Sequence, residues 1–229
     1  MTGMKQLIFC ISFFLLSLAV SAQADDHKVI DRSGENGTIM YFFQKEEIQG
    51  SQFLKDDWMK AALYGDRGIK FESAKVKFDS YNNKFVFDRH DTTYELSSMI
   101  YTLYLYPNED DTAKKIVFKK GYAINNRINA NKFLQVIAEG KLSLLKYYSK
   151  DLEEYTEYGN ATKFKRFKDM EQYYVLQNGQ YSPISISPKN LENQMQSKWT
   201  EVQAYMKKNN LSAKNEKDWA TLISYYNSL

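Results

Sequence analysis

Few side chains in this chain suit nucleophilic or metal chemistry. Past residue 22 it has two histidines and no cysteine. His90 lies in the run Asp88-Arg89-His90-Asp91, where a carboxylate could orient the imidazole for acid–base catalysis. The same residue types are common in polar turns between strands, and we favour that interpretation. His27 lies in a polar segment, and we expect no role for it.

The acidic residues and serines do not select a reaction either. No HExxH motif or other His–carboxylate spacing typical of a transition-metal site occurs. Residues 109–111 (EDD) could bind Ca²⁺ weakly, but such loops are more often only solvated. Nothing singles out a glycosidase-type pair among the 28 acidic residues, and G-x-S-x-G and phosphate-binding glycine loops are absent. We assign no catalytic residue, no metal and no cofactor.

Aromatic side chains are the remaining candidates for function. The chain has 18 Tyr, 14 Phe and 3 Trp, and Tyr and Trp suit both sugar stacking and protein interfaces. Core packing is the alternative for each of them, but a strand face left uncovered would be a binding surface. The candidate binding residues are Trp58, Tyr101, Tyr104, Tyr106, Tyr147 and Tyr148.

The first 22 residues have the pattern of a cleaved signal peptide. Lys5 precedes an apolar run over residues 7–20, and Val20-Ser21-Ala22 offers the small residues of a cleavage site. The run is about 14 residues long, whereas a membrane span takes about 20. Cys10 follows Phe9 inside the run, which argues against lipidation. We expect a periplasmic, outer-membrane-associated or extracellular protein with no transmembrane span in residues 23–229.

Charge and cysteine content narrow the function classes further. The net charge is +3, and basic residues are spread among acidic ones, so we expect no nucleic-acid partner. Cys10 is the only cysteine, and it lies in the predicted signal. The absence of cysteine after it excludes disulfide-rich scaffolds, thiol nucleophiles and cysteine metal sites for the exported protein. Residues 23–229 are long enough for one large domain or two small ones.

The elements that would position these side chains centre on residues 131–148 (NKFLQVIAEGKLSLLKYY), the most apolar stretch after the signal. Gly140 permits a tight reversal, so this stretch predicts a β-hairpin whose strands are apolar on both faces. Residues 23–36 are expected to be a flexible lead-in and residues 38–43 a first strand. Residues 149–160 read as a helical turn or an arm, and residues 53–64 as either a helix or a loop followed by a strand.

The period of apolar residues changes at Ser187-Pro188, a helix cap followed by proline. Asn178-Gly179 predicts a hairpin before it, and Ser212 could cap the last helix. We predict an α+β, mainly β fold. About ten antiparallel strands form a meander over residues 37–186, as a sandwich or partly open barrel. Two or three short helices over residues 187–229 pack on the sheet.

Several stretches together resemble a family of uncharacterised exported proteins common in Bacteroidetes. They are residues 50–58 (GSQFLKDDW), residues 76–87 (VKFDSYNNKFVF), residues 133–146 (FLQVIAEGKLSLLK), residues 173–179 and residues 222–227. The departures are Gln52 where proline is usual and Ala61-Ala62 where glycine is usual. The resemblance implies this order of elements and an envelope or secreted location, and it favours loop plus strand for residues 53–64. It implies no activity.

These observations predict a non-enzymatic envelope protein that binds a protein partner as a scaffold, with its oligomeric state left open. A carbohydrate-binding module using exposed aromatic residues is the alternative, and a carboxylate-based hydrolase is the third reading. The first predicts a broad apolar or aromatic patch, the second coplanar exposed rings, and the third two carboxyl groups facing each other in a pocket.

Overall fold

The computed structural model describes residues 48–68, 70–89, 92–108, 111, 113–159 and 162–229. The predicted signal peptide, lead-in and first strand over residues 38–43 lie outside this part of the chain, as do His27, His90 and two of the three acidic residues at 109–111. Those interpretations stay predictions.

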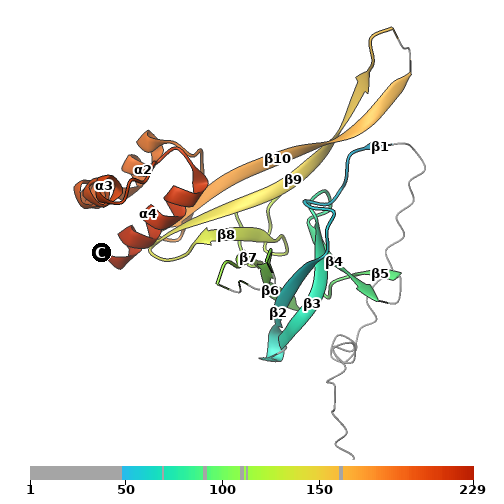
Figure 1. The fold of residues 1–229 in the computed structure, drawn as a ribbon, viewed down its shortest axis with the longest axis horizontal. Coiled ribbons are helices and arrows are strands. Elements are labelled where there is room, and N and C mark those ends of the chain that lie inside the picture. Colours follow the sequence, from blue (N-terminus) through green and yellow to red (C-terminus); the bar gives the residue numbers. More distant parts are fainter. Residues whose placement is uncertain (1–47, 69, 90–91, 109–110, 112, 160–161) are drawn as a thin grey trace, which may run out of the picture.

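The described residues form a mainly β fold that ends in helices (Figure 1). The strands are β1 Ile48–Gln49, β2 Met59–Gly65, β3 Lys70–Asp79, β4 Lys84–Arg89, β5 Thr92–Glu95, β6 Ile100–Tyr106, β7 Ile116–Lys119, β8 Leu134–Ala138, β9 Leu142–Thr156, β10 Lys163–Gln177 and β11 Gln180–Ile184. The helices are α2 Pro188–Met195, α3 Trp199–Lys208 and α4 Glu216–Ser228, with 3₁₀ turns η1 Asp66–Gly68 and η2 Gln196–Lys198. No described helix has the length and apolar character needed to cross a membrane.

The strands belong to one sheet with the order β1-β10-β9-β8-β7-β6-β2-β3-β4-β5, and β11 also pairs with β10. The prediction of an entirely antiparallel sheet is wrong at β1, because Ile48 and Gln49 pair in parallel with Lys165 and Arg166. Strand β10 runs from the tip of the β9–β10 hairpin toward the body of the sheet. The chain follows the same direction through β1 on its way to β2, so the two strands must be parallel.

The predicted single meander is interrupted between β5 and β6. Strand β6 does not continue from β5 but pairs with β2, which therefore lies between β3 and β6. The four strands β2 to β5 form one meander, and β6 to β11 form a second that starts on the free edge of β2.

The first half of the sheet curls on itself. Strands β3 and β7 are separated by β2 and β6, so they would lie roughly 14 Å apart in a flat sheet. The rings of Phe78 on β3 and Phe118 on β7 nevertheless have centroids 5.0 Å apart, and Phe85 on β4 lies 5.3 Å from Phe118. The sheet is therefore open but strongly curled.

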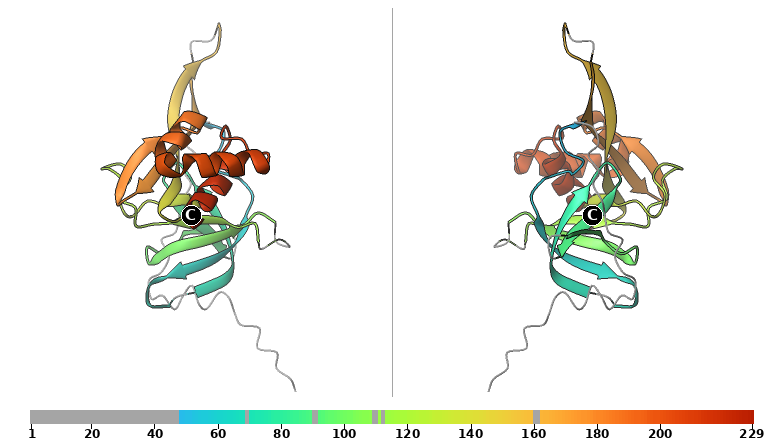
Figure 2. Two further views of the ribbon diagram at one scale, coloured as in Figure 1. Left: turned by 90° about the vertical axis from the view of Figure 1, so that its left-hand side faces the viewer. Right: turned by 90° about the vertical axis from the view of Figure 1, so that its right-hand side faces the viewer.

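Figure 2 shows the helices packed beside one end of the sheet. The buried side chains form three apolar cores. The first fills the inside of the curl, around Leu63, Phe78 and Phe118. The second lies where the helices pack on the β8–β9 end, around Leu144 and Trp219. The third lies on the outer face of β8 to β10, where Ile128 of the β7–β8 loop packs against them. Strand β8 contributes to the second and third cores, and β9 packs against all three, which accounts for the apolar character of both sides of the central hairpin.

The local signals are mostly confirmed. Asn178 and Gly179 both have positive φ, 52° and 77°, and form the two-residue turn between β10 and β11. Ser187 caps α2 and accepts a hydrogen bond from the Asn190 N–H at 3.3 Å. The prediction that Ser212 caps the last helix is wrong: Asn215 does so, because α4 begins at Glu216.

Residues 53–64 take the loop-plus-strand form, and the helix alternative is wrong. Phe53 forms an isolated bridge with Asp79, and β2 begins at Met59. The apolar residues of β2 are buried between two neighbouring strands, which gives more burial than one face of a short helix would.

Candidate functional site

The structure does not bring the six predicted aromatic residues to one surface. Tyr147 and Tyr148 are consecutive in β9 and point to opposite faces of the sheet. Tyr147 is only 4% exposed and belongs to the third core. Tyr148 packs against the first core, and its hydroxyl donates a hydrogen bond to Gln135 Oε1 at 2.6 Å.

The other four candidates are more exposed than Tyr147. Tyr104 and Tyr106 are alternate residues of β6 and point to one face of the sheet, and Trp58 lies near them because Lys60 of β2 pairs with Tyr106. Trp58 precedes β2, is 36% exposed and has Lys77 Nζ 4.6 Å above its ring. Tyr101, near the start of β6, is 44% exposed, whereas Tyr104 and Tyr106 are half-buried. The Tyr104 ring contacts Tyr64 and has Lys115 Nζ 4.0 Å from its centroid. Because Tyr147 lies in a core, the six rings do not all share one exposed surface.

The far part of the β9–β10 hairpin projects beyond the body of the sheet (Figure 1). We call residues 151–156 and 163–168 the arm. Its strands pair residue by residue, from Asp151 with Lys168 to Thr156 with Lys163. The arm contacts the rest of the protein through Phe167 against Tyr81, the short β1 pairing with its hydrogen bond from the Tyr155 hydroxyl to Gln49, and an exposed ion pair between Asp151 and Arg127. Most of its other side chains face solvent.

Side-chain pairs across its two strands hold the arm together. Arg166 binds Glu153 at 2.8 Å and its guanidinium carbon lies 5.0 Å from the centre of the Tyr155 ring. The Tyr155 and Phe164 rings have centroids 5.7 Å apart. Arg166 and Lys168 lower the pKa of Glu153, first through the hydrogen bond from Arg166. Such exposed pairs contribute little individually, so the arm depends on the whole ladder.

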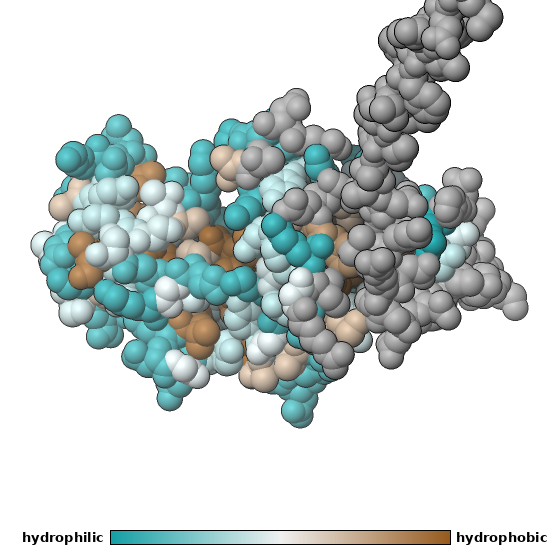
Figure 3. All heavy atoms as spheres, turned by 90° about the horizontal axis from the view of Figure 1, so that it is seen from below, coloured by the Kyte–Doolittle hydropathy of each residue, from teal (hydrophilic) through white to brown (hydrophobic). Residues whose placement is uncertain are grey.

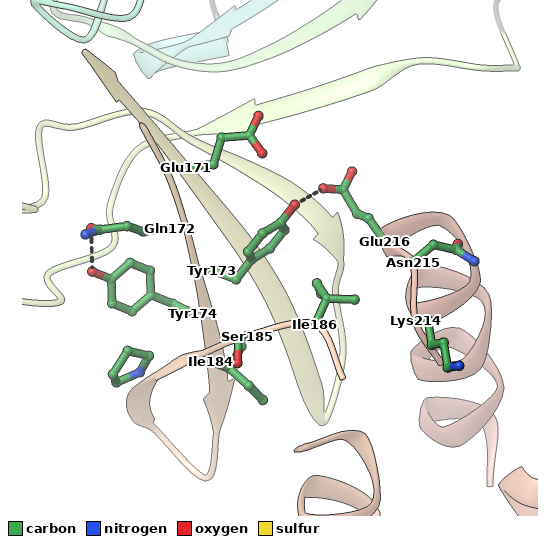
Figure 4. A pocket seen from close by; sticks show the side chains of 11 residues that line it. Glu171, Gln172, Tyr173, Tyr174, Ile184, Ser185, Ile186, Lys214, Asn215 and Glu216 are labelled. Carbon is green, nitrogen blue, oxygen red and sulfur yellow. Dashed lines mark hydrogen bonds between the residues drawn. The ribbon is translucent and has the colours of Figure 1, made fainter. Parts of the chain in front are cut away.

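A buried lysine joins the helices to the sheet. Lys146 on β9 is 7% exposed, and its ammonium lies 2.8 Å from Glu171 on β10 and 3.0 Å from Glu216 at the start of α4. The Tyr173 hydroxyl donates to the same Glu216 oxygen at 2.7 Å. Figure 4 shows the Tyr173 hydroxyl directed at Glu216. These side chains and Glu171 line a hollow of about 540 Å³.

The electrostatics of this group fit a structural clamp. Burial alone would lower the pKa of Lys146, but its hydrogen bonds with Glu171, Glu216 and Tyr173 outweigh burial and raise it. Burial and the hydrogen bond to Glu216 raise the pKa of Tyr173 to about 12. Both carboxylates are bound to the Lys146 ammonium group, so each charge in this group has a partner of opposite sign. We therefore interpret the arrangement as a link between α4 and the sheet.

A second hollow, of about 420 Å³, opens at one end of the curled sheet. It lies between the β3–β4 turn, the residues after β5 and the β7–β8 loop. Asn83 fixes two of these segments, since its side chain accepts from the Phe133 N–H at 2.7 Å and donates to the Phe133 carbonyl at 3.0 Å. Lys84, Lys120 and Lys132 line the hollow, with Glu95 as the acidic residue among them.

No metal cluster is formed by the described residues, since no three of their His, Cys, Asp and Glu side chains gather closely enough. On the face shown in Figure 3, apolar side chains reach the surface in separate areas surrounded by hydrophilic ones. That view shows no broad apolar patch on the part of the face that it displays.

Sequence reasoning missed the arm's extent, the Lys146 clamp and the hollow with three lysines. The clamp and the hollow combine residues far apart in the chain, and lysines scattered among polar residues carry no local signal. No family model, curated protein or solved structure matches the chain.

Proposed function

We propose that this chain is an exported envelope protein that works by binding a protein partner, and that the arm makes the contact. The observation that carries the proposal is the arm itself, most of which lies outside the three apolar cores. A two-stranded ribbon is marginally stable by itself in water. A projecting ribbon that contributes little to the core is best explained by an interaction.

The outer edge of β9 supports a specific mode of contact. Among the described residues, β8 pairs with β9 only as far as Lys146, so no described strand covers β9 beyond that point. Within the arm, where β9 is mostly exposed, alternate N–H and C=O groups along this edge can pair with an added strand. Leu152, which is 39% exposed, and Tyr155 offer apolar contacts on opposite faces of the arm. The partner is therefore an extended segment of an envelope protein that adds to the sheet.

Shortening the arm tests this proposal. Residues 152–167 are replaced by Asn-Gly, the turn that the protein uses at residues 178–179. The cross-strand partners Asp151 and Lys168 then flank the new two-residue turn. The full-length arm and the shortened arm are compared by crosslinking in the native envelope followed by capture. We expect the same partner to be lost with the shortened arm, while circular dichroism and thermal unfolding show that the body is folded.

Two proline variants separate strand addition from other contacts. The N–H groups of Glu153 and Glu154 point to opposite edges of β9. Of the substitutions Glu153→Pro and Glu154→Pro, one therefore removes a hydrogen-bond donor of the β9–β10 ladder, and the other removes a donor at the outer edge. The outer-edge variant keeps the ladder and should still lose the partner. Equal capture by the native and shortened arms would overturn the proposal.

The carbohydrate alternative needs coplanar exposed rings, and among the six aromatic residues Tyr101 at 44% and Trp58 at 36% are the most exposed. The hydrolase alternative needs two facing carboxyl groups in a pocket. Glu171 and Glu216 line one hollow together, and both are bound by Lys146.

A further inference from the structure

The hollow at the end of the curled sheet has an unusual balance of charge. Three lysines and one glutamate line it, so its walls are cationic. Lys84 Nζ lies 2.7 Å from Glu95 Oε2, so the one carboxylate among the described residues that line the hollow is already paired with Lys84. Lys132 Nζ donates to the carbonyl of Asn82 at 3.3 Å, which neutralises no charge.

Lys120 is a half-buried ammonium group of the hollow that has no carboxylate in contact with it among the described residues. Its Nζ lies 4.4 Å from the centre of the Phe133 ring, and none of the described carboxylates is within ion-pair distance of it. Burial lowers the pKa of Lys120, while the nearby charge of Glu95 opposes that shift. A half-buried cation of this kind is stabilised when an anion enters the hollow.

Amide groups line the same hollow and suit hydroxyl groups. Asn129 uses its Oδ1 to accept from the Asn131 N–H at 3.0 Å, which leaves its Nδ2 directed to no described partner. The Asn131 side chain makes no hydrogen bond with a described residue either. An amide both donates and accepts, as a sugar hydroxyl does. The volume of about 420 Å³ falls within the usual range for small ligands, and the open end of a curled sheet is a common place for such sites.

We propose that this hollow binds an acidic sugar, with its carboxylate or sulfate beside Lys120 and Lys132 and its hydroxyl groups against Asn129 and Asn131. The site lies away from the arm and does not depend on the partner proposed above. It differs from an aromatic stacking platform because ammonium and amide groups make the contacts.

The test uses the purified protein with three probes: glucuronate, glucose 6-sulfate and glucose. Binding is followed by calorimetry and by ¹H–¹⁵N chemical shifts of the asparagine side chains. We expect at least one acidic sugar to bind at least about tenfold more tightly than glucose, since hydrogen bonds to charged groups are the stronger ones. The preferred probe shows which acid the site selects.

Lys120→Met should weaken that binding by about tenfold or more. The variant should remain folded because it removes a charge that burial disfavours. Lys119→Met is the matched control: Lys119 is adjacent in sequence, but pairs with Glu139 at 2.7 Å and lies outside the hollow. Equal affinity for glucose, unchanged affinity in Lys120→Met, or no saturable shift with either acid would overturn the proposal.

Discussion

Asn227 in the last turn of α4 binds both backbone polar groups of Leu142 at the start of β9. Its Oδ1 accepts from the Leu142 N–H and its Nδ2 donates to the Leu142 carbonyl, each at 2.9 Å. At the other end of the central hairpin, the Asn83 side chain likewise binds both the N–H and the carbonyl of Phe133. A side-chain amide thus replaces a neighbouring strand at both places.

Asn227→Ala should destabilise the protein by about 1–3 kcal/mol, because it leaves the Leu142 N–H and carbonyl without partners. Urea unfolding measures the change. Ser224→Ala is the control, since the Ser224 hydroxyl bonds only within α4, to the Ala220 carbonyl. Equal effects of the two substitutions would contradict the role given to Asn227.

Gly140→Ala should also destabilise, because a Cβ at this position would overlap the Asn227 side chain. The double variant Gly140→Ala/Asn227→Gly removes the obstacle. In a double-mutant cycle, its loss of stability should therefore be smaller than the sum of the losses measured for Gly140→Ala and Asn227→Gly alone. Additive losses would show that the two positions do not contact each other.

Lys146→Met should cost about 1–3 kcal/mol of unfolding free energy. It leaves Glu171 and Glu216 without their cation, although both carboxylates are partly exposed and can regain water. The comparison is Lys119→Met, whose pair with the largely exposed Glu139 should contribute about 0–1 kcal/mol. If both variants unfold at the same urea concentration, Lys146 does not act as a clamp.

Stability should fall at alkaline pH. The Tyr173 pKa is 10.0 in an ordinary environment and about 12 in the fold, so the folded protein holds this proton more tightly. The stabilising contribution is complete below about pH 10 and is lost as the pH rises to about 12. The raised pKa of Lys146 acts in the same direction. Urea midpoints across this range measure the loss, and Tyr173→Phe should show a shallower fall than the native protein.

The arm should exchange its amide hydrogens faster than the rest of the same two strands. Residues 142–150 of β9 are mostly buried, whereas residues 151–156 mostly face water. Hydrogen exchange followed by mass spectrometry compares peptides from the two parts. Equal protection along β9 would show that the arm is held by contacts beyond its own ladder.

Sequence reasoning worked where the signal is local. The Asn178-Gly179 turn, the Ser187 cap and the spacing of Trp219, Leu222 and Ile223 on α4 depend on residues within a few positions of one another. The six aromatic candidates were chosen by residue type, and type does not say which face of a strand is covered. Tyr147 and Tyr148 show this, since their burial depends on what packs on each face.

The sequence by itself determined a mainly β chain with a central apolar hairpin and a helical end, because turn chemistry and apolar period are properties of short segments. The tertiary structure decided that β6 pairs with β2, that β1 runs parallel to β10, and that three lysines meet at one end of the curl. Those arrangements depend on which strand edges remain free when distant segments meet, and no short stretch of sequence carries that information.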